Sequence, residues 1–109
     1  MNSNRKGKVG ERELVNYLKD RGFSGAQRSQ QYKGNAESAD VVGALDGYHI
    51  ECKRVESLSL YEAVAQAKRD MGPLDVPLVC HRRNGKEWLA IVPLNEFLEL
   101  VKRAGVRTA

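Results

Sequence analysis

The segment 38–54, S-A-D-V-V-G-A-L-D-G-Y-H-I-E-C-K-R, constrains the fold more than any other part of the chain. Two short runs rich in apolar and β-branched residues flank the dipeptide Asp46-Gly47, which favours a two-residue type I′ turn between antiparallel strands. Such a turn sets three opposed pairs: Leu45 with Tyr48, Val42 with Glu51, and Asp40 with Lys53. We therefore predict a β-hairpin in this register.

The predicted hairpin has two unlike faces, because side chains two residues apart lie on the same side of a strand. One face is suited to burial and carries Val41, Gly43, Leu45, Tyr48, Ile50 and Cys52. The other face carries Asp40, Val42, Ala44, His49, Glu51 and Lys53. Two carboxylates and an ammonium are thus expected to meet at one end of a small sheet.

This cluster predicts a metal site. Neighbouring carboxylates raise each other's pKa unless a cation compensates, and carboxylate oxygens suit magnesium or manganese better than zinc or copper. Such a metal can turn a bound water into a nucleophile and neutralise charge on a phosphoryl oxygen. Lys53 would then hold that water or a phosphate oxygen. The alternative is a pair of surface salt bridges, Asp40 with Lys53 and Glu51 with Arg54.

Length and composition narrow the class of protein. The chain has 109 residues, which suit one domain with a modest core, expected to span residues 1–109. No apolar run approaches a membrane span and the first residues are polar, so we expect a cytoplasmic protein that does not enter a membrane. Two cysteines are too few for a disulfide scaffold or a zinc site. The net charge of +4 favours a polyanionic partner.

A first helix is predicted over residues 4–20, ended by Gly22. Its apolar stripe, which includes Leu14 and Leu18, extends back to Glu11 by helical spacing. A carboxylate on such a stripe needs a partner, unless its head reaches solvent near the start of the helix. Basic residues gather at the same helix end, either as a solvated face or as the border of the predicted site: Arg5, Lys6, Lys8 and Arg12.

A second helix is predicted over residues 59–71, where Ser59 and Glu62 have capping-box spacing and Gly72-Pro73 ends the helix. Gln66 shares one face of this helix with small residues, which would allow close packing against a sheet. That face consists of Ala63, Gln66, Ala67 and Asp70. Lys68 and Arg69 add positive charge to the same helix.

The remaining segments complete an α/β pattern. A poorly apolar strand is expected around residues 26–28, and the polar loop 29–38, which contains Lys33, either grips phosphates or serves only as a connection. A second hairpin is predicted from strands 76–82 and 87–92. A last helix over residues 93–104 should turn four side chains inward: Leu94, Phe97, Leu98 and Val101. His49 and His81 are expected to be strand residues and not ligands.

The order of these features resembles the PD-(D/E)xK nuclease superfamily. Within it, the chain is most similar to archaeal-type and phage Holliday junction resolvases. Three segments carry the resemblance: G-E-R-E-L-V-N-Y-L-K-D-R-G-F, S-A-D-V-V-G and H-I-E-C-K-R. Together they cover roughly the first half of the chain. The proline that often precedes the first acidic residue of the motif is replaced here by Ala39.

The resemblance implies a single α/β domain with a mixed central sheet flanked by helices, as in restriction endonucleases. It implies a Mg²⁺- or Mn²⁺-dependent endonuclease that cuts four-way DNA junctions by water attack and leaves 5′-phosphate ends. It assigns Asp40, Glu51 and the Cys52 carbonyl as metal ligands and Lys53 as the catalytic lysine. Glu11 would complete the acidic site, and Gln66 matches a glutamine often found on the following helix.

The partner implied is branched or duplex DNA, bound inside the cell. Two symmetric cuts further imply a homodimer. Side chains expected to contact DNA are Arg5, Lys6, Lys8, Arg12, Lys33, Arg54, Lys68 and Arg69. Two alternatives stay open. One is a stand-alone nuclease of the VRR-NUC type that nicks DNA or cuts flaps, and the other is a non-catalytic basic protein that binds nucleic acid.

Overall fold

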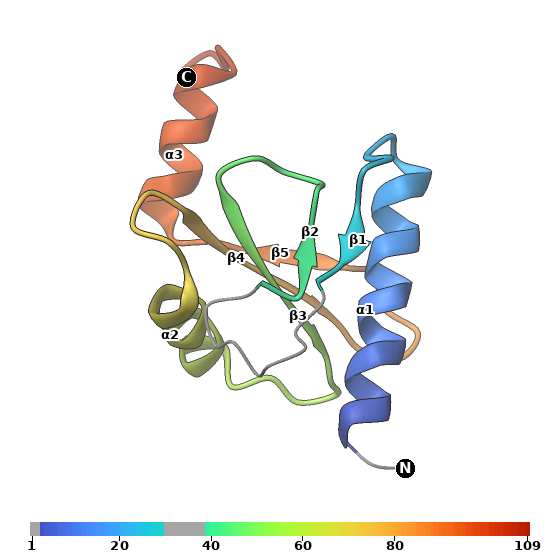
Figure 1. Cartoon of the computed structure of the whole chain (residues 1–109). Helices are drawn as coiled ribbons and strands as arrows, with labels where there is room; N and C mark the ends of the chain where they lie inside the picture. The colour runs from blue at the N-terminus through green and yellow to red at the C-terminus, as the bar shows by residue number, and fades with distance from the viewer. Residues whose placement is uncertain (1–2, 30–38) are drawn as a thin grey trace.

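The computed structural model describes residues 3–29 and 39–109, with side chains described for residues 7–29 and 39–109. The helices and strands follow one another in the order that the sequence predicts (Figure 1). The elements are α1 (Ser3–Asp20), β1 (Gln27–Arg28), β2 (Val41–Val42), β3 (Tyr48–Arg54), α2 (Leu60–Asp70), β4 (Val76–Arg82), β5 (Leu89–Ile91) and α3 (Leu94–Arg103). The predicted Lys33 contact lies outside the described residues.

The strands form one five-stranded mixed sheet in the order β1-β2-β3-β4-β5. β3 and β4 are parallel, whereas the other neighbouring pairs are antiparallel. A parallel pair needs a long crossover, and α2 supplies it between β3 and β4. The α/β class and the mixed sheet flanked by helices are therefore confirmed.

The hairpin of β2 and β3 has a different register from the predicted one. Val41 pairs with Ile50, so the strands are shifted by two residues from the predicted register. The predicted pairs are therefore wrong. The chain does turn at Asp46-Gly47, where the amide of Tyr48 donates to the carbonyl of Leu45 at 3.4 Å. A type I′ turn needs positive φ at both central residues, but only the glycine has it (φ 81°). A two-residue shift keeps the side chains of β2 and β3 on their predicted faces. Ala44, predicted on the polar face, instead packs against the larger core, because β2 ends at Val42 and alternation does not extend into the connection.

Gly43 accounts for the longer connection between these strands. It adopts a φ of 80°, and a Cβ there would lie 2.3 Å from the carbonyl oxygen of Gly25. An L-side chain would therefore be both strained and crowded at this position. The close approach of these glycines ends β2 at Val42 and packs the connection against the segment that leads into β1.

α1 covers one face of the sheet and α2 the other (Figure 1). The larger core, beneath α1, consists of Leu14, Val15, Ala26, Val41, Ile50, Leu78 and Cys80. The smaller core, beneath α2, consists of Ala63, Ala67 and Val79. Leu78 and Val79 are consecutive in β4 yet belong to different cores, so the centre of the sheet is buried on both faces.

The bounds of α1 and α2 lie close to the predicted ones. Ser59 precedes α2 as predicted, but the capping box is not formed, because the Ser59 side chain makes no capping hydrogen bond. Within the described ranges, no helix is both long and apolar enough to cross a membrane.

The inward orientation predicted for the last helix is wrong. No residue of α3 is buried, and Leu94, Phe97 and Leu98 are 69%, 49% and 48% exposed. The reason is the path of the chain after β5: α3 projects away from the sheet instead of lying across it (Figure 1). Its apolar stripe therefore lies largely on the surface of the protein.

Candidate active site

Asp40, which directly precedes β2, lies next to Glu51 of β3. Counting one residue back from Val41 and one forward from Ile50 places them opposite each other. The amide of Asp40 donates to the Ile50 carbonyl at 2.8 Å, and the amide of Cys52 donates to Asp40 Oδ2 at 2.8 Å. These bonds hold the Asp40 carboxylate against the backbone of β3, on the face that carries Glu51.

The electrostatics of this pair reflect burial and like charge. Burial, the negative charge of Asp40 and a hydrogen bond with its side chain together raise the pKa of Glu51 to about 8. Lys53 lowers the pKa of Glu51, and Asp70 on α2 raises it further. Glu51 is only 4% exposed. A buried Glu51 carboxylate in contact with the half-buried Asp40 carboxylate therefore carries negative charge that its surroundings do not fully stabilise, which a proton or a cation can relieve.

Lys53 and Gln66 meet on the same face of the sheet. Lys53 Nζ donates to Gln66 Oε1 at 2.9 Å, which links β3 to α2. The buried Ala63 and Ala67 bring this face of α2 close to the strands. The structure thus places Lys53 beside Glu51 with its ammonium oriented by Gln66.

Glu11 lies at the border of the cluster, half-buried on α1. Burial and the charge of Asp40 raise its pKa, whereas the hydrogen bond and the charge of Arg28 and the charge of Lys8 lower it. Arg28 Nε donates to Glu11 Oε1 at 3.0 Å. Arg28 was not among the predicted site residues. The sequence indicated only that Arg28 belongs to a short first strand. The pairing of Arg28 with Val41 brings it to the site.

His49 is a second residue of the site that was not among the predicted site residues. It is a strand residue, as expected, but its Nε2 lies 2.6 Å from Glu51 Oε1, and His49 is only 3% exposed. The available signal was its position two residues before Glu51, which puts both side chains on one face of β3. His49 is therefore in direct contact with a predicted metal ligand.

The predicted DNA-contacting side chains lie at several places around the site. Lys8 and Arg12 are exposed on α1, and Lys68 and Arg69 are exposed on α2. The side chains of Arg5, Lys6 and Lys33 lie outside the described part. Their contacts with DNA stay predictions.

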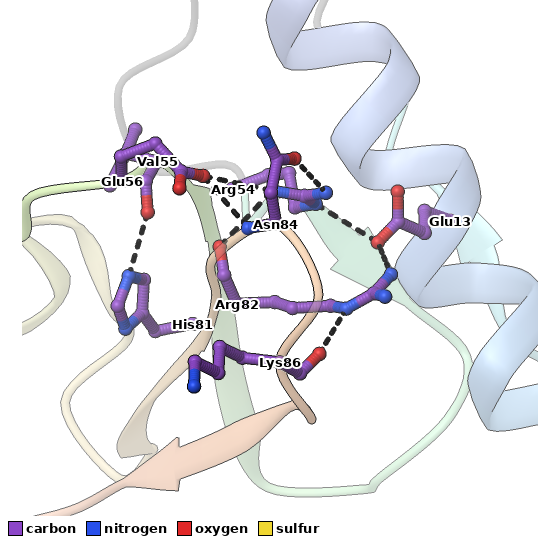
Figure 2. Close-up of polar contacts among 8 residues, drawn as sticks. All are labelled: Glu13, Arg54, Val55, Glu56, His81, Arg82, Asn84 and Lys86. Atoms are coloured by element: carbon purple, nitrogen blue, oxygen red, sulfur yellow. Dashed lines mark hydrogen bonds and ion pairs between the residues drawn. The ribbon is translucent and has the colours of Figure 1, made fainter.

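Arg54, also predicted to contact DNA, belongs to a polar network on the opposite face from Lys53. Its Nε donates to Glu13 Oε1 at 3.0 Å and its Nη2 to Asn84 Oδ1 at 2.8 Å. Arg82 of β4 donates to the same Glu13 oxygen, so one carboxylate of α1 binds two neighbouring strands (Figure 2). The salt bridge of Glu51 with Arg54 that the alternative interpretation required is thus replaced by pairing of Arg54 with Glu13.

The family model of the archaeal Holliday junction resolvase (hjc) matches residues 2–103 of the chain. The chain belongs to this family. The match includes every segment that carried the resemblance, and it confirms a nuclease that acts on four-way DNA junctions. The stand-alone nuclease and the non-catalytic binder gain no support from it. Comparisons with curated proteins and with solved structures give no match.

Nucleases of the resolvase family normally depend on a divalent metal. Among the described side chains, those of residues 7–29 and 39–109, no group of three or more His, Cys, Asp or Glu is arranged to hold a metal ion. Magnesium is often held by only one or two carboxylates, with waters and substrate phosphates completing its shell. The contacting carboxylates of Asp40 and Glu51 supply this kind of donor set. The residues present therefore fit magnesium or manganese.

Proposed function

We propose that this resolvase hydrolyses DNA phosphodiesters with Mg²⁺ or Mn²⁺ held by Asp40, Glu51 and the backbone carbonyl of Cys52. One observation carries the proposal: the buried carboxylate of Glu51 meets the half-buried carboxylate of Asp40 on the sheet face that also presents a lysine. Burial and the negative charge of Asp40 raise the pKa of Glu51, which means that the ionised pair is unfavourable without a cation. A cation between them would remove that cost.

The proposed roles follow from the positions of the side chains. A bound metal supplies an activated water and neutralises charge on the phosphoryl group. Lys53 contributes a fixed positive charge to the attacking water or to a phosphate oxygen, and Gln66 orients it through their 2.9 Å hydrogen bond. Glu11 completes the acidic site at its border. The cut strand keeps a 5′-phosphate, as the family resemblance implies.

The proposal is tested by a cleavage panel. Purified protein is incubated with a labelled four-way junction, a duplex and a single strand, each with magnesium and with chelator. We expect magnesium-dependent cleavage, strongest on the junction, with ends that a 5′-phosphate-dependent exonuclease accepts. Absence of magnesium-dependent cleavage on all three substrates would contradict the proposal and favour a protein that only binds nucleic acid.

We further infer that the working unit is a homodimer inside the cell, where its DNA substrate lies. Two symmetric cuts across a junction require two active sites, and a two-fold dimer supplies them. The exposed apolar stripe of α3, with Leu94, Phe97 and Leu98, is a surface of the kind that protein contacts cover. Sedimentation should show a dimer at the concentration used for cleavage, and mapping to nucleotide resolution should show paired cuts. A monomer that still makes paired cuts would contradict the inference.

A further inference from the structure

We propose that His49 is a positioning residue, which fixes the Glu51 carboxylate in the orientation that binds the divalent metal. The inference rests on the proposed function, because it concerns a ligand of the proposed metal site. It adds a residue that neither the sequence motif nor the family resemblance assigns.

The geometry is that of a tight and dry hydrogen bond. His49 Nε2 and Glu51 Oε1 are 2.6 Å apart, and the two side chains are 3% and 5% exposed. A hydrogen bond to a carboxylate is strongest where water cannot compete with it. Both residues belong to β3, which is paired on both sides, so the backbone beneath them is held by β2 and β4.

Glu51 is bound from two sides. One of its oxygens is taken by His49, and the carboxylate also shares a hydrogen bond with Asp40, the other proposed ligand. A ligating carboxylate is ionised, so in the metal-bound protein His49 must be the donor, with its proton on Nε2. The hydrogen bond from His49 then keeps the Glu51 carboxylate from rotating when a cation binds.

The size of the effect follows from how such partners act in metal sites generally. Removing a group that hydrogen-bonds a metal ligand lowers metal affinity by roughly 10–100-fold. Without His49, the Glu51 side chain would lose conformational freedom each time it binds the metal. The affinity for metal should therefore fall.

His81 offers a matched control on the same sheet face. It is the parallel-strand neighbour of Lys53. Its Nε2 lies 2.9 Å from the carbonyl oxygen of Val55. Figure 2 marks this contact with a dashed line. His81 therefore makes a similar hydrogen bond to the backbone, and not to a carboxylate. Its removal should leave the proposed metal ligands undisturbed.

The test measures Mn²⁺ binding to the full chain without DNA, from the signal of unbound Mn²⁺ in electron paramagnetic resonance. His49→Leu should weaken binding by about 10-fold or more. His49→Gln should recover most of the affinity, because its amide nitrogen can donate from nearly the position of Nε2. His81→Leu should bind as the wild type does. Wild-type affinity in His49→Leu, or equal weakness in His49→Gln and His49→Leu, would overturn the inference.

A second measurement covers the case in which His49→Leu does not fold. Nitrogen-15 NMR of the wild-type protein saturated with Mg²⁺ reports which ring nitrogen of His49 is protonated. We expect a proton on Nε2, and an unprotonated Nε2 would overturn the inference. If the wild type neither binds Mn²⁺ nor cleaves DNA with metal, both the proposed function and this inference fail. If the wild type does both while His49→Leu binds metal unchanged, only the role of His49 fails.

Discussion

The two faces of β3 differ in character, because residues that alternate along the strand are largely apolar toward α1 and polar toward α2. Toward α1, Ile50 is buried in the larger core and Cys52 packs against it, while Arg54 pairs with Glu13. Toward α2, the same strand presents His49, Glu51 and Lys53, all of them polar. The apolar side chains buried beneath α2 are small ones, Ala63, Ala67 and Val79.

This contrast separates stability from chemistry within one strand. Burial of apolar area contributes about 25 cal/mol per Å², so the larger core beneath α1 supplies most of the stabilisation. The face beneath α2 instead buries the Glu51 carboxylate, which is unfavourable unless a cation binds beside it. Residues that alternate along β3 should therefore respond in different ways to substitution.

The largest expected effect is loss of cleavage in Asp40→Asn. The substitution removes a proposed metal ligand while keeping shape, so junction cleavage should fall to background. DNA binding should be kept or tightened, because a negative charge near the phosphates is lost. Cleavage and gel-shift assays measure the two properties. Asp46→Asn, the same change at an exposed turn position, is the control, and an unchanged cleavage rate in Asp40→Asn would contradict the site.

Lys53→Ala should also abolish cleavage, but for another reason. The variant loses the fixed positive charge at the transition state and keeps both carboxylates, so Mn²⁺ binding should persist. Arg54→Ala, the neighbouring change on the opposite face, should act mainly on stability because Arg54 links α1 to the strands. If Lys53→Ala loses metal binding and cleavage together, the lysine supports the metal site and not the reaction.

The pH dependence of stability should differ between wild type and Glu51→Gln when metal is removed. The folded pKa of Glu51 is raised to about 8 from an ordinary value of 4.5. A raised pKa contributes stability that is fully present below about pH 4.5 and is lost as pH rises through about 8. Urea unfolding at pH 5 and pH 8 with chelator should show the wild type losing more stability than Glu51→Gln. Equal losses would show that Glu51 is ionised without cost.

A smaller effect is expected on the α1 face from Glu13→Gln. The change weakens the bonds to Arg54 and Arg82, which are partly exposed, so the free energy of unfolding should fall by roughly 1–2 kcal/mol. The cleavage rate of the folded variant should stay near that of the wild type. Glu62→Gln, exposed on α2, serves as the control in urea unfolding. A loss of cleavage without a loss of stability would place Glu13 in the site.

The smallest effect concerns the exposed cations. Lys8→Gln or Arg12→Gln should each weaken junction binding and lower the slope of log affinity against log salt by roughly one unit per lost phosphate contact. The control is Lys102→Gln, an exposed lysine on α3 that pairs with Glu99. An unchanged slope in both α1 variants would show that DNA approaches another face.

The sequence predicted the faces of β3 better than its register. Alternation assigns Glu51 and Lys53 to one side whatever the exact turn, since a shift of two residues preserves the side. The longer connection between β2 and β3 depends on Gly43 and its contact with Gly25, which is distant in the sequence. Contacts between side chains of different elements could not be predicted from the sequence either. Arg28 meets Glu11 only through strand pairing, and the exposure of α3 depends on the direction in which the chain leaves β5.

The contact between Gly25 and Gly43 has a consequence for any survey of variants of this protein. Larger residues at either position would force apart the segment before β1 and the connection after β2, and so displace Arg28 from Glu11. In a screen that scores only loss of activity, both glycines would rank beside the catalytic residues although neither has a reactive group. Tolerance maps of this chain should therefore pair each activity score with a measure of protein abundance.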